Sequence, residues 1–220
     1  MADEPALPEL YRAARERVTG LVLAHPDGDR APAPATPGWC VHDLVAHLTG
    51  VAEDLLEGRV PKTGPTPEWT SGHVQRGAGV TADELLTTWA GLSPAVEELL
   101  AAKPVWPIGL DVGAHEHDIR GALGNTDERD SDLVRVGASV LLRGLRVPRP
   151  LVVRTEHEEI RVGPEDGGPT LLTTTAFEAF RWRLGRRSRR QLAAMDWSGE
   201  PEPYLDWLCV FGPAEHDVVE

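Results

Sequence analysis

The sequence predicts an α+β protein, with a helical bundle in residues 1–126 and a small α/β domain in residues 127–220. Apolar residues recur at helical spacing through the first half of the chain, which favours a four-helix bundle. Short runs rich in β-branched residues appear only in the second half, where they favour a three-stranded sheet. The chain has 220 residues, 41% of them hydrophobic and 26% charged, so it is long enough for two such cores.

Four helices are expected in the N-terminal half, over about residues 5–24, 41–55, 81–100 and 108–123. Thr81 and Glu84 form a capping-box pattern that marks the start of the third helix. Pro94 lies inside this helix and is expected to kink or restart it, because proline removes a hydrogen bond from a helix interior. Residues 60–80 are rich in proline and glycine, which predicts a long loop before the third helix.

The second half of the chain changes character. A fifth amphipathic helix is expected first, followed by three β-rich runs and then two more helices. Their expected ranges are Ser131–Leu145, Leu151–Thr155, Glu159–Val162, Leu171–Thr175, Ala176–Leu184 and the vicinity of Tyr204–Phe211. The boundary between the two domains should lie near Asn125–Asp130.

Charge and composition exclude several classes of partner. The formal net charge is -13, from 22 basic and 35 acidic residues, and a field of this sign repels nucleic acid and anionic lipid. The chain lacks an apolar run long enough to span a membrane, and its acidic start does not look like a secretory leader. Cys40 and Cys209 are two distant thiols, typical of a reduced compartment. We therefore expect a cytoplasmic monomer or homodimer without nucleic-acid or membrane partners.

Two histidines and one acid form a candidate metal site. Asp111 and His115 are spaced i,i+4 on the fourth helix, so their side chains share one face. His47 lies at the edge of the apolar stripe of the second helix and should point into the bundle. Two imidazoles and one carboxylate leave coordination positions free, as a catalytic zinc site requires. A satisfied core histidine is the alternative interpretation of His47.

Several neighbouring polar residues are less informative. Asp118 either holds the His115 ring from behind or is solvated. Glu116 and His117 are expected to point to other faces of the helix and to take no part in the site. The remaining histidines in polar or loop contexts are expected to be solvated, and they are His25, His73, His157 and His216.

Six arginines crowd one segment of the second domain, and they are Arg181, Arg183, Arg186, Arg187, Arg189 and Arg190. One interpretation is a solvated helix face that neutralises part of the acid excess. The other is a site that recognises a carboxylate or phosphate with planar guanidinium groups. The net negative charge of the chain opposes a nucleic-acid role for this segment.

Three segments together resemble one known family. They are TPGWCVHDLVAHLTG (residues 36–50), DVGAHEHDIRGALG (111–124) and LTTTAFEAFRWRLGRRS (172–188). In order and pattern they resemble the DinB-like superfamily, in its mycothiol-dependent maleylpyruvate isomerase branch. The resemblance implies a DinB-like bundle with a divalent metal, usually zinc, on a His, a Glu and a His. The matching positions are His47, Asp111 and His115, where the acid is one methylene shorter than the family's Glu. The resemblance also implies a catalytic arginine in the C-terminal domain, matched by Arg186.

The same resemblance implies an actinobacterial enzyme that acts on a small electrophilic substrate with mycothiol as thiol cosubstrate. The metal would stabilise the thiolate for attack on an electrophilic carbon, so that the enzyme is an isomerase or an S-transferase. Arg186 would hold a substrate carboxylate or a developing enolate. Two alternatives are a metal-dependent hydrolase or lyase on the same bundle, and a non-catalytic binding module that has lost its metal.

Overall fold

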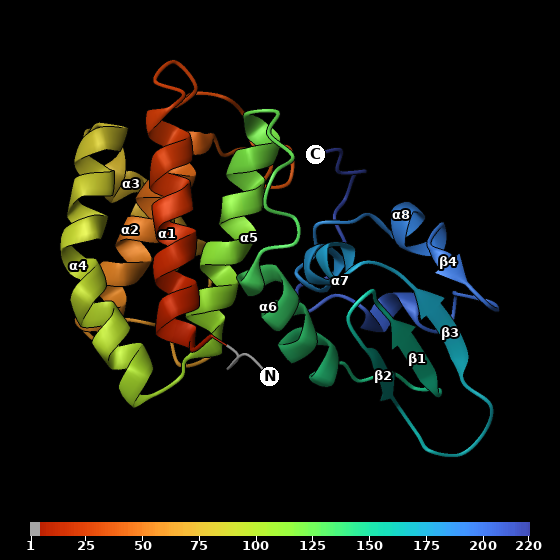
Figure 1. The fold of residues 1–220 in the computed structure, drawn as a ribbon. Coiled ribbons are helices and arrows are strands. Elements are labelled where there is room, and N and C mark those ends of the chain that lie inside the picture. Colours follow the sequence, from red (N-terminus) through yellow and green to blue (C-terminus); the bar gives the residue numbers. More distant parts are fainter. Residues whose placement is uncertain (1–4) are drawn as a thin grey trace. The chain divides into compact units, whose positions relative to one another are not determined.

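The computed structural model of the protein describes residues 5–220, which form two compact units (Figure 1). The first unit comprises the chain up to Asp127 together with Glu220, and the second comprises Glu128–Val219. Cys40 and Cys209 are both free thiols. Among the described residues, none of the helices combines the length and the hydrophobicity needed to cross a membrane.

The first unit is helical, as the apolar spacing predicts. Its helices are α1 (Leu7–Leu23), α2 (Val41–Leu56), α3 (Pro67–Gly77), α4 (Ala82–Ala102) and α5 (Trp106–Ala122). The helices α1 and α2 each pack against both α4 and α5, so these four form the expected bundle, and α3 packs on α2 (Figure 1). The apolar stripes of α1 and α2 are buried almost completely, which places the core of the unit between the four long helices.

The predicted start of α4 is confirmed, whereas a restart of the helix at Pro94 does not occur. The backbone N–H of Glu84 donates to the Thr81 hydroxyl, and Glu84 accepts from the Thr81 backbone N–H at 2.9 Å, which completes a capping box. The helix α4 then continues through Pro94 to Ala102 as one element. The buried indole of Trp89 donates to the Tyr11 hydroxyl at 2.7 Å, so packing against α1 supports the helix on the N-terminal side of the proline.

The long loop predicted over residues 60–80 is also wrong in part, because α3 occupies most of it. Thr66 caps this helix by accepting from the backbone N–H of Trp69, and Pro67 stands in its first turn, where a missing N–H costs nothing. Gly72 and Gly77 lower its intrinsic helix propensity. The helix is therefore stabilised mainly by packing on α2, which no local pattern reveals.

The second unit combines helices with a small sheet. Its elements are α6 (Asp132–Arg143), β1 (Leu151–Arg154), β2 (Glu159–Val162), β3 (Thr170–Thr173), α7 (Ala176–Arg183), α8 (Arg189–Ala193) and β4 (Asp196–Trp197). The strand order is β2-β1-β3-β4, with β1 antiparallel to β2 and parallel to β3, and β3 antiparallel to β4. The sheet thus has four strands instead of three, because the two-residue β4 is too short to leave a sequence pattern.

The end of the chain differs from the prediction as well. Only a short 3-10 turn, Leu205–Trp207, forms where a helix was expected near Tyr204–Phe211. Tyr204 and Leu205 are buried, but Val210 and Phe211 are exposed, so the apolar residues here do not line one helical face. The unpredicted helix α8 begins at a capping box formed by Ser188 and Gln191.

A buried ion-pair group joins α1 to α5. Glu116, which the sequence suggests to be a bystander, is buried and accepts two hydrogen bonds of 2.8 Å from Arg17 on α1. It also accepts from Nε and Nη2 of Arg120, which is itself buried. Glu116 therefore takes no part in the candidate metal site but fixes the rotation of α5 about its own axis, one residue beyond His115.

Replacing Glu116 with Gln should destabilise the first unit by about 3 kcal/mol, because it removes the buried carboxylate charge that pairs with both Arg17 and Arg120. The measurement is the free energy of unfolding from denaturant titration, followed by far-ultraviolet circular dichroism. Glu97→Gln is the matched control, since Glu97 also pairs with an arginine of α1, the half-exposed Arg12. Its loss should cost under about 1 kcal/mol. Equal effects of the two variants would contradict the structural role of Glu116.

Candidate metal centre

The structure brings together the three ligands that the sequence suggests. His47 extends from α2, and Asp111 and His115 extend from successive turns of α5. Nε2 of His47 is 3.5 Å from Oδ2 of Asp111, and Nε2 of His115 is 3.5 Å from Oδ1 of the same carboxylate. The ligand atoms of all three residues lie within 4.8 Å of one another. A second group of this kind is exposed and belongs to the other unit, and its members are Asp130, Glu156 and His157.

The spacing suits a small divalent cation. Zinc bound to nitrogen or oxygen at about 2.0–2.1 Å with tetrahedral angles places neighbouring ligand atoms about 3.4 Å apart. Each imidazole nitrogen lies 3.5 Å from one oxygen of Asp111, close to this value, so the shorter Asp side chain still reaches both rings. Oδ2 of Asp111 is moreover buried and accepts no hydrogen bond from the described residues, so one ligand oxygen has no competing donor. The residues present therefore fit the metal.

The electrostatics of the group favour an added positive charge. Burial raises the pKa of the Asp111 carboxyl, but the charges that His47 and His115 carry when protonated outweigh burial and hold this pKa below its usual range. Burial lowers the pKa of His115, yet the charge of Asp111 and hydrogen bonds to Asp111 and Asp118 raise it overall. A proton or a metal ion between these groups is therefore stabilised, and the two compete for the same nitrogen.

A buried carboxylate orients His115 from behind. Nδ1 of His115 donates to Oδ2 of Asp118 at 2.8 Å, and Asp118 is fully buried. The same oxygen accepts from the hydroxyl of Thr36 at 2.9 Å, which fixes the carboxylate in turn. Of the two interpretations of Asp118, the structure thus supports the one in which it holds the ring. This contact leaves the lone pair of Nε2 for a ligand and directs it toward Asp111.

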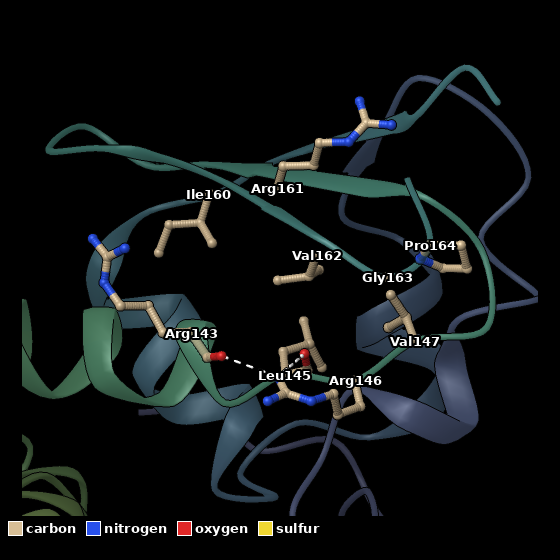
Figure 2. A pocket seen from close by; sticks show the side chains of 9 residues that line it. All are labelled: Arg143, Leu145, Arg146, Val147, Ile160, Arg161, Val162, Gly163 and Pro164. Carbon is tan, nitrogen blue, oxygen red and sulfur yellow. Dashed lines mark hydrogen bonds between the residues drawn. The ribbon is translucent and has the colours of Figure 1, made fainter. Parts of the chain in front are cut away.

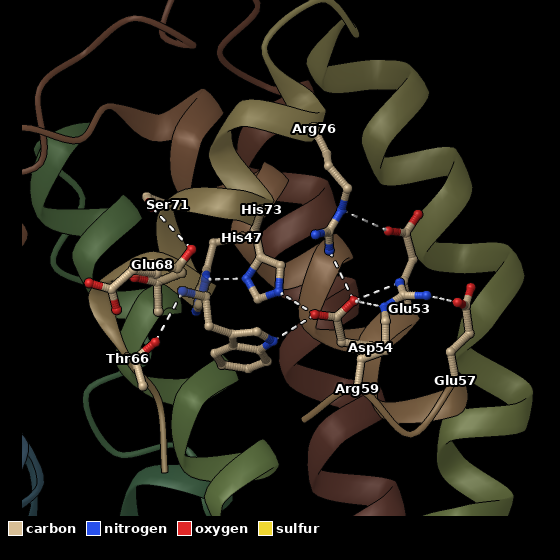
Figure 3. Close-up of polar contacts among 12 residues, drawn as sticks. His47, Glu53, Asp54, Glu57, Arg59, Thr66, Glu68, Ser71, His73 and Arg76 are labelled. Carbon is tan, nitrogen blue, oxygen red and sulfur yellow. Dashed lines mark hydrogen bonds and ion pairs between the residues drawn. The ribbon is translucent and has the colours of Figure 1, made fainter. Parts of the chain in front are cut away.

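A second histidine orients His47, and the sequence prediction for it is wrong. His73 on α3 is buried rather than solvated, and its Nδ1 lies 3.0 Å from Nδ1 of His47 (Figure 3). Its Nε2 lies 3.0 Å from Oδ2 of the buried Asp54. Burial lowers the pKa of His73 more than its contact with Asp54 raises it, so this ring tends to be neutral. Recognising Thr66-Pro67 as a helix start could have found this residue, because Trp69 and His73 then share one face.

Two tryptophans border the candidate ligands. The Trp39 ring lies 5.2 Å from that of His47 and 6.2 Å from that of His115, between ring centroids. Trp69 lies 6.2 Å from His47 on the side of α3. The side chain of Asp111 is 30% exposed, whereas those of His47 and His115 are 2% and 8% exposed. Solvent and small molecules therefore reach the centre beside the carboxylate, while aromatic rings cover parts of the imidazoles.

The arginine segment lies in the second unit, and only part of it is solvated. Arg181, Arg183 and Arg187 are buried, which corrects the interpretation of the whole cluster as a solvated face. Arg183 donates to the carbonyls of Leu141 and Leu208, and Arg187 forms two hydrogen bonds with Glu178. Arg189 and Arg190 pair with acidic residues on the surface. Most of the cluster thus stabilises its own unit.

Arg186, the predicted catalytic arginine, is half-buried just after a tight turn. The turn needs glycine at position 185, where φ is +81° and a Cβ would lie 2.7 Å from the carbonyl oxygen of Gly212. Nη1 of Arg186 donates to the carbonyl of Leu184 at 2.7 Å. Arg186 belongs to the second unit and the three candidate ligands belong to the first, so its catalytic role stays a prediction.

A pocket of about 660 Å³ lies elsewhere in the second unit (Figure 2). Its walls are apolar residues of β2 and of the segment between α6 and β1, and Arg143, Arg146 and Arg161 stand around it. These arginines already donate to Glu158 and to backbone carbonyls of the same region. None of the described residues that line this pocket is an acid, a histidine or a cysteine.

Comparisons with known proteins agree with this arrangement. A family model described as the mycothiol maleylpyruvate isomerase N-terminal domain matches residues 11–122, which is half of the chain and includes all three candidate ligands. A crystal structure of the mycothiol-dependent maleylpyruvate isomerase is 16% identical and superposes with a TM-score of 0.60, covering 90% of this chain and 94% of that one. A structure of a mutant of that enzyme gives 15% identity and a TM-score of 0.58 over the same shares.

At this identity the likeness to the solved structures shows the fold alone. None of the curated proteins compared with the chain matches it significantly. The family model, by contrast, covers α2 and α5 and the ligands that they carry. The chain therefore belongs to the mycothiol-dependent maleylpyruvate isomerase family.

Proposed function

We propose that the protein is a metal-dependent enzyme that uses mycothiol as thiol cosubstrate on a small electrophilic molecule. The observation that carries the proposal is the convergence of Nε2 of His47, Nε2 of His115 and the Asp111 carboxylate at 3.5 Å separations. Membership of the family supports the choice of thiol, since the matching family is named for mycothiol. The proposed products are a cis–trans isomer, or an S-conjugate if the thiol is retained.

The metal is held by His47, Asp111 and His115, and zinc suits this set of two imidazoles and one carboxylate. When bound, a divalent cation favours the thiolate form of mycothiol near neutral pH. Asp118 directs the lone pair of His115 toward the centre, and Trp39 limits the access of water to both imidazoles. The partly exposed side of Asp111 is where the thiol and its electrophilic partner enter.

Arg186 is proposed to bind a carboxylate of the substrate or to stabilise an enolate as it develops. Arg186 directly follows the constrained turn at Gly185, and its guanidinium donates to the Leu184 carbonyl. A planar guanidinium group can donate two parallel hydrogen bonds to a carboxylate. The neighbouring buried arginines are less suited to this role, because Arg183 and Arg187 hold carbonyls and a carboxylate of their own unit.

The decisive experiment is turnover of maleylpyruvate by the metal-loaded protein with and without mycothiol, with the products separated by chromatography. A cis–trans isomer that forms only with the thiol supports isomerase activity, and a stable thiol conjugate supports S-transfer. Turnover that is independent of the thiol would instead indicate a hydrolase or lyase, with metal-bound water as the nucleophile.

The purified protein, prepared without an affinity tag, should bind one divalent metal ion per chain. Asp111→Asn keeps the size of the side chain but removes its charge, so it should reduce the metal content after dialysis to near zero. The measurement is elemental analysis together with zinc titration. Asp43→Asn is the control, because Asp43 is an acid of α2 that caps the helix at Cys40 and lies outside the ligand group. A wild-type protein that stays metal-free after zinc addition would contradict the proposed centre.

Arg186→Ala should lower turnover by roughly 100-fold while leaving the melting temperature nearly unchanged, because a fork that holds a developing anion is worth about 3–4 kcal/mol in the transition state. Arg186→Lys should recover little of this loss, since a point charge does not form two parallel hydrogen bonds. Arg190→Ala serves as the control, because the Arg190 side chain is 83% exposed. Equal losses in Arg186→Ala and Arg190→Ala would mean that only the general positive field matters.

A further inference from the structure

A chain of polar contacts leads from a buried carboxylate to the candidate metal ligand His47. It begins at Oδ2 of Asp54 on α2, passes through both ring nitrogens of His73 on α3, and ends at Nδ1 of His47 (Figure 3). Both nitrogen contacts of His73 are 3.0 Å long. The opposite nitrogen of His47, Nε2, faces Asp111 at 3.5 Å. All three residues of the chain are buried, so water does not replace these contacts.

The positions of the protons follow from the first contact. An ionised carboxylate only accepts hydrogen bonds, so Nε2 of His73 must carry the hydrogen that it donates to Asp54. In a neutral imidazole the other nitrogen is then an acceptor, so Nδ1 of His73 must accept from Nδ1 of His47. The hydrogen of a neutral His47 therefore sits on Nδ1, and its Nε2 keeps a lone pair directed at Asp111.

Asp54 is well suited to start such a chain because several donors surround it. Its Oδ2 also accepts from the indole N–H of Trp69 at 2.6 Å. Its Oδ1 accepts from Nε of Arg59 at 2.9 Å and from Nη2 of Arg76 at 3.0 Å. Two guanidinium groups keep this carboxylate ionised and fix its orientation, so it cannot act as a hydrogen donor toward His73.

The sequence also provides the space that His73 occupies. Its ring lies against α2 at Gly50, where a Cβ would approach Cδ2 of His73 to 2.6 Å. Glycine at this position therefore lets α3 place an imidazole between Asp54 and His47. Trp69, one turn earlier on α3, covers the same ring at 4.4 Å between centroids.

We infer that His73 and Asp54 are positioning residues that hold His47 in the tautomer with its hydrogen on Nδ1 and its Nε2 lone pair facing Asp111. Asp118 does the same for His115 from the other side of the centre. The inference rests on the proposed function in one respect, namely that the lone pair of His47 Nε2 coordinates a metal cation. Contacts of this kind typically change metal affinity by about 10–100-fold when they are removed.

The test compares His73→Leu, which removes both contacts, with His73→Gln, whose amide can still accept from His47 and donate to Asp54. The matched control is His42→Leu, because His42 is an equally buried histidine of α2 that contacts the Val80 carbonyl at 2.7 Å and no candidate ligand. The measurements on the full chain are the zinc Kd by chelator competition, the melting temperature without metal, and the His47 tautomer. The tautomer comes from two-bond ¹H–¹⁵N correlation spectra of the metal-free protein at pH 8.

The wild type should show His47 protonated on Nδ1, and His73→Leu should lose this signature and weaken zinc binding by about 10–100-fold. His73→Gln should retain most of the affinity, and His42→Leu should bind zinc as the wild type does, even if it melts lower. If His73→Leu does not fold, Gly50→Ala replaces it, since its methyl group displaces the ring but removes no polar atom. It should weaken zinc binding although alanine is the better helix former.

Two results would overturn the inference. One is a wild-type His47 that carries its hydrogen on Nε2 or exchanges freely between tautomers. The other is an equal loss of zinc affinity in His73→Leu and His42→Leu, which would mean that any buried histidine on these helices acts through stability alone. A wild type with the Nδ1–H signature but without zinc binding would leave the tautomer assignment standing and refute the proposed metal centre, so the two claims fail separately.

Discussion

Three hydrogen-bond acceptors that face one another at short range impose the main constraint on the helical unit. Two imidazole nitrogens and a carboxylate converge from α2 and α5. Their lone pairs repel one another electrostatically unless a proton or a cation lies between them. The neighbouring contacts oppose this repulsion. Asp118 and Thr36 hold one ring, His73 and Asp54 hold the other, and Glu116 ties the shared helix to α1. The bundle thus holds a site whose parts would otherwise move apart.

The buried charges of this unit are arranged in separate groups, each neutralised by its own partners. Asp54 has two arginines, and Glu116 has two others. Asp118 accepts from His115 and from a threonine hydroxyl, and the contact with His115 couples it directly to the centre. This pairing matters because an unpaired ion inside a bundle costs several kcal/mol. Two of the groups also contact candidate ligands, Asp54 through His73 and Asp118 directly, so the buried charges of the helices are coupled to the centre.

The three candidate ligands could be predicted from sequence because their signals are local. Asp111 and His115 share a helical face by spacing alone, and His47 lies on a regular apolar stripe. His73 could not be found in the same way, because α3 contains two glycines and folds through its contacts with α2. The burial of Arg183 depends on the carbonyls of Leu141 and Leu208, both distant in sequence, so composition alone suggested a solvated face. Strand β4 has only two residues, which is too short for an alternating pattern that would predict a strand.

The uneven exposure of the ligands also bears on how a metal ion would exchange. The imidazoles are nearly inaccessible and fixed by hydrogen bonds behind them, whereas the Asp111 carboxylate is partly exposed and has one oxygen that accepts no hydrogen bond from the described residues. Dissociation of a bound ion would then begin with rotation of a single short side chain, while both nitrogens stay in place. The rate of exchange would depend on the χ1 torsion of Asp111, and the rigid pair of rings would set the selectivity for the ion.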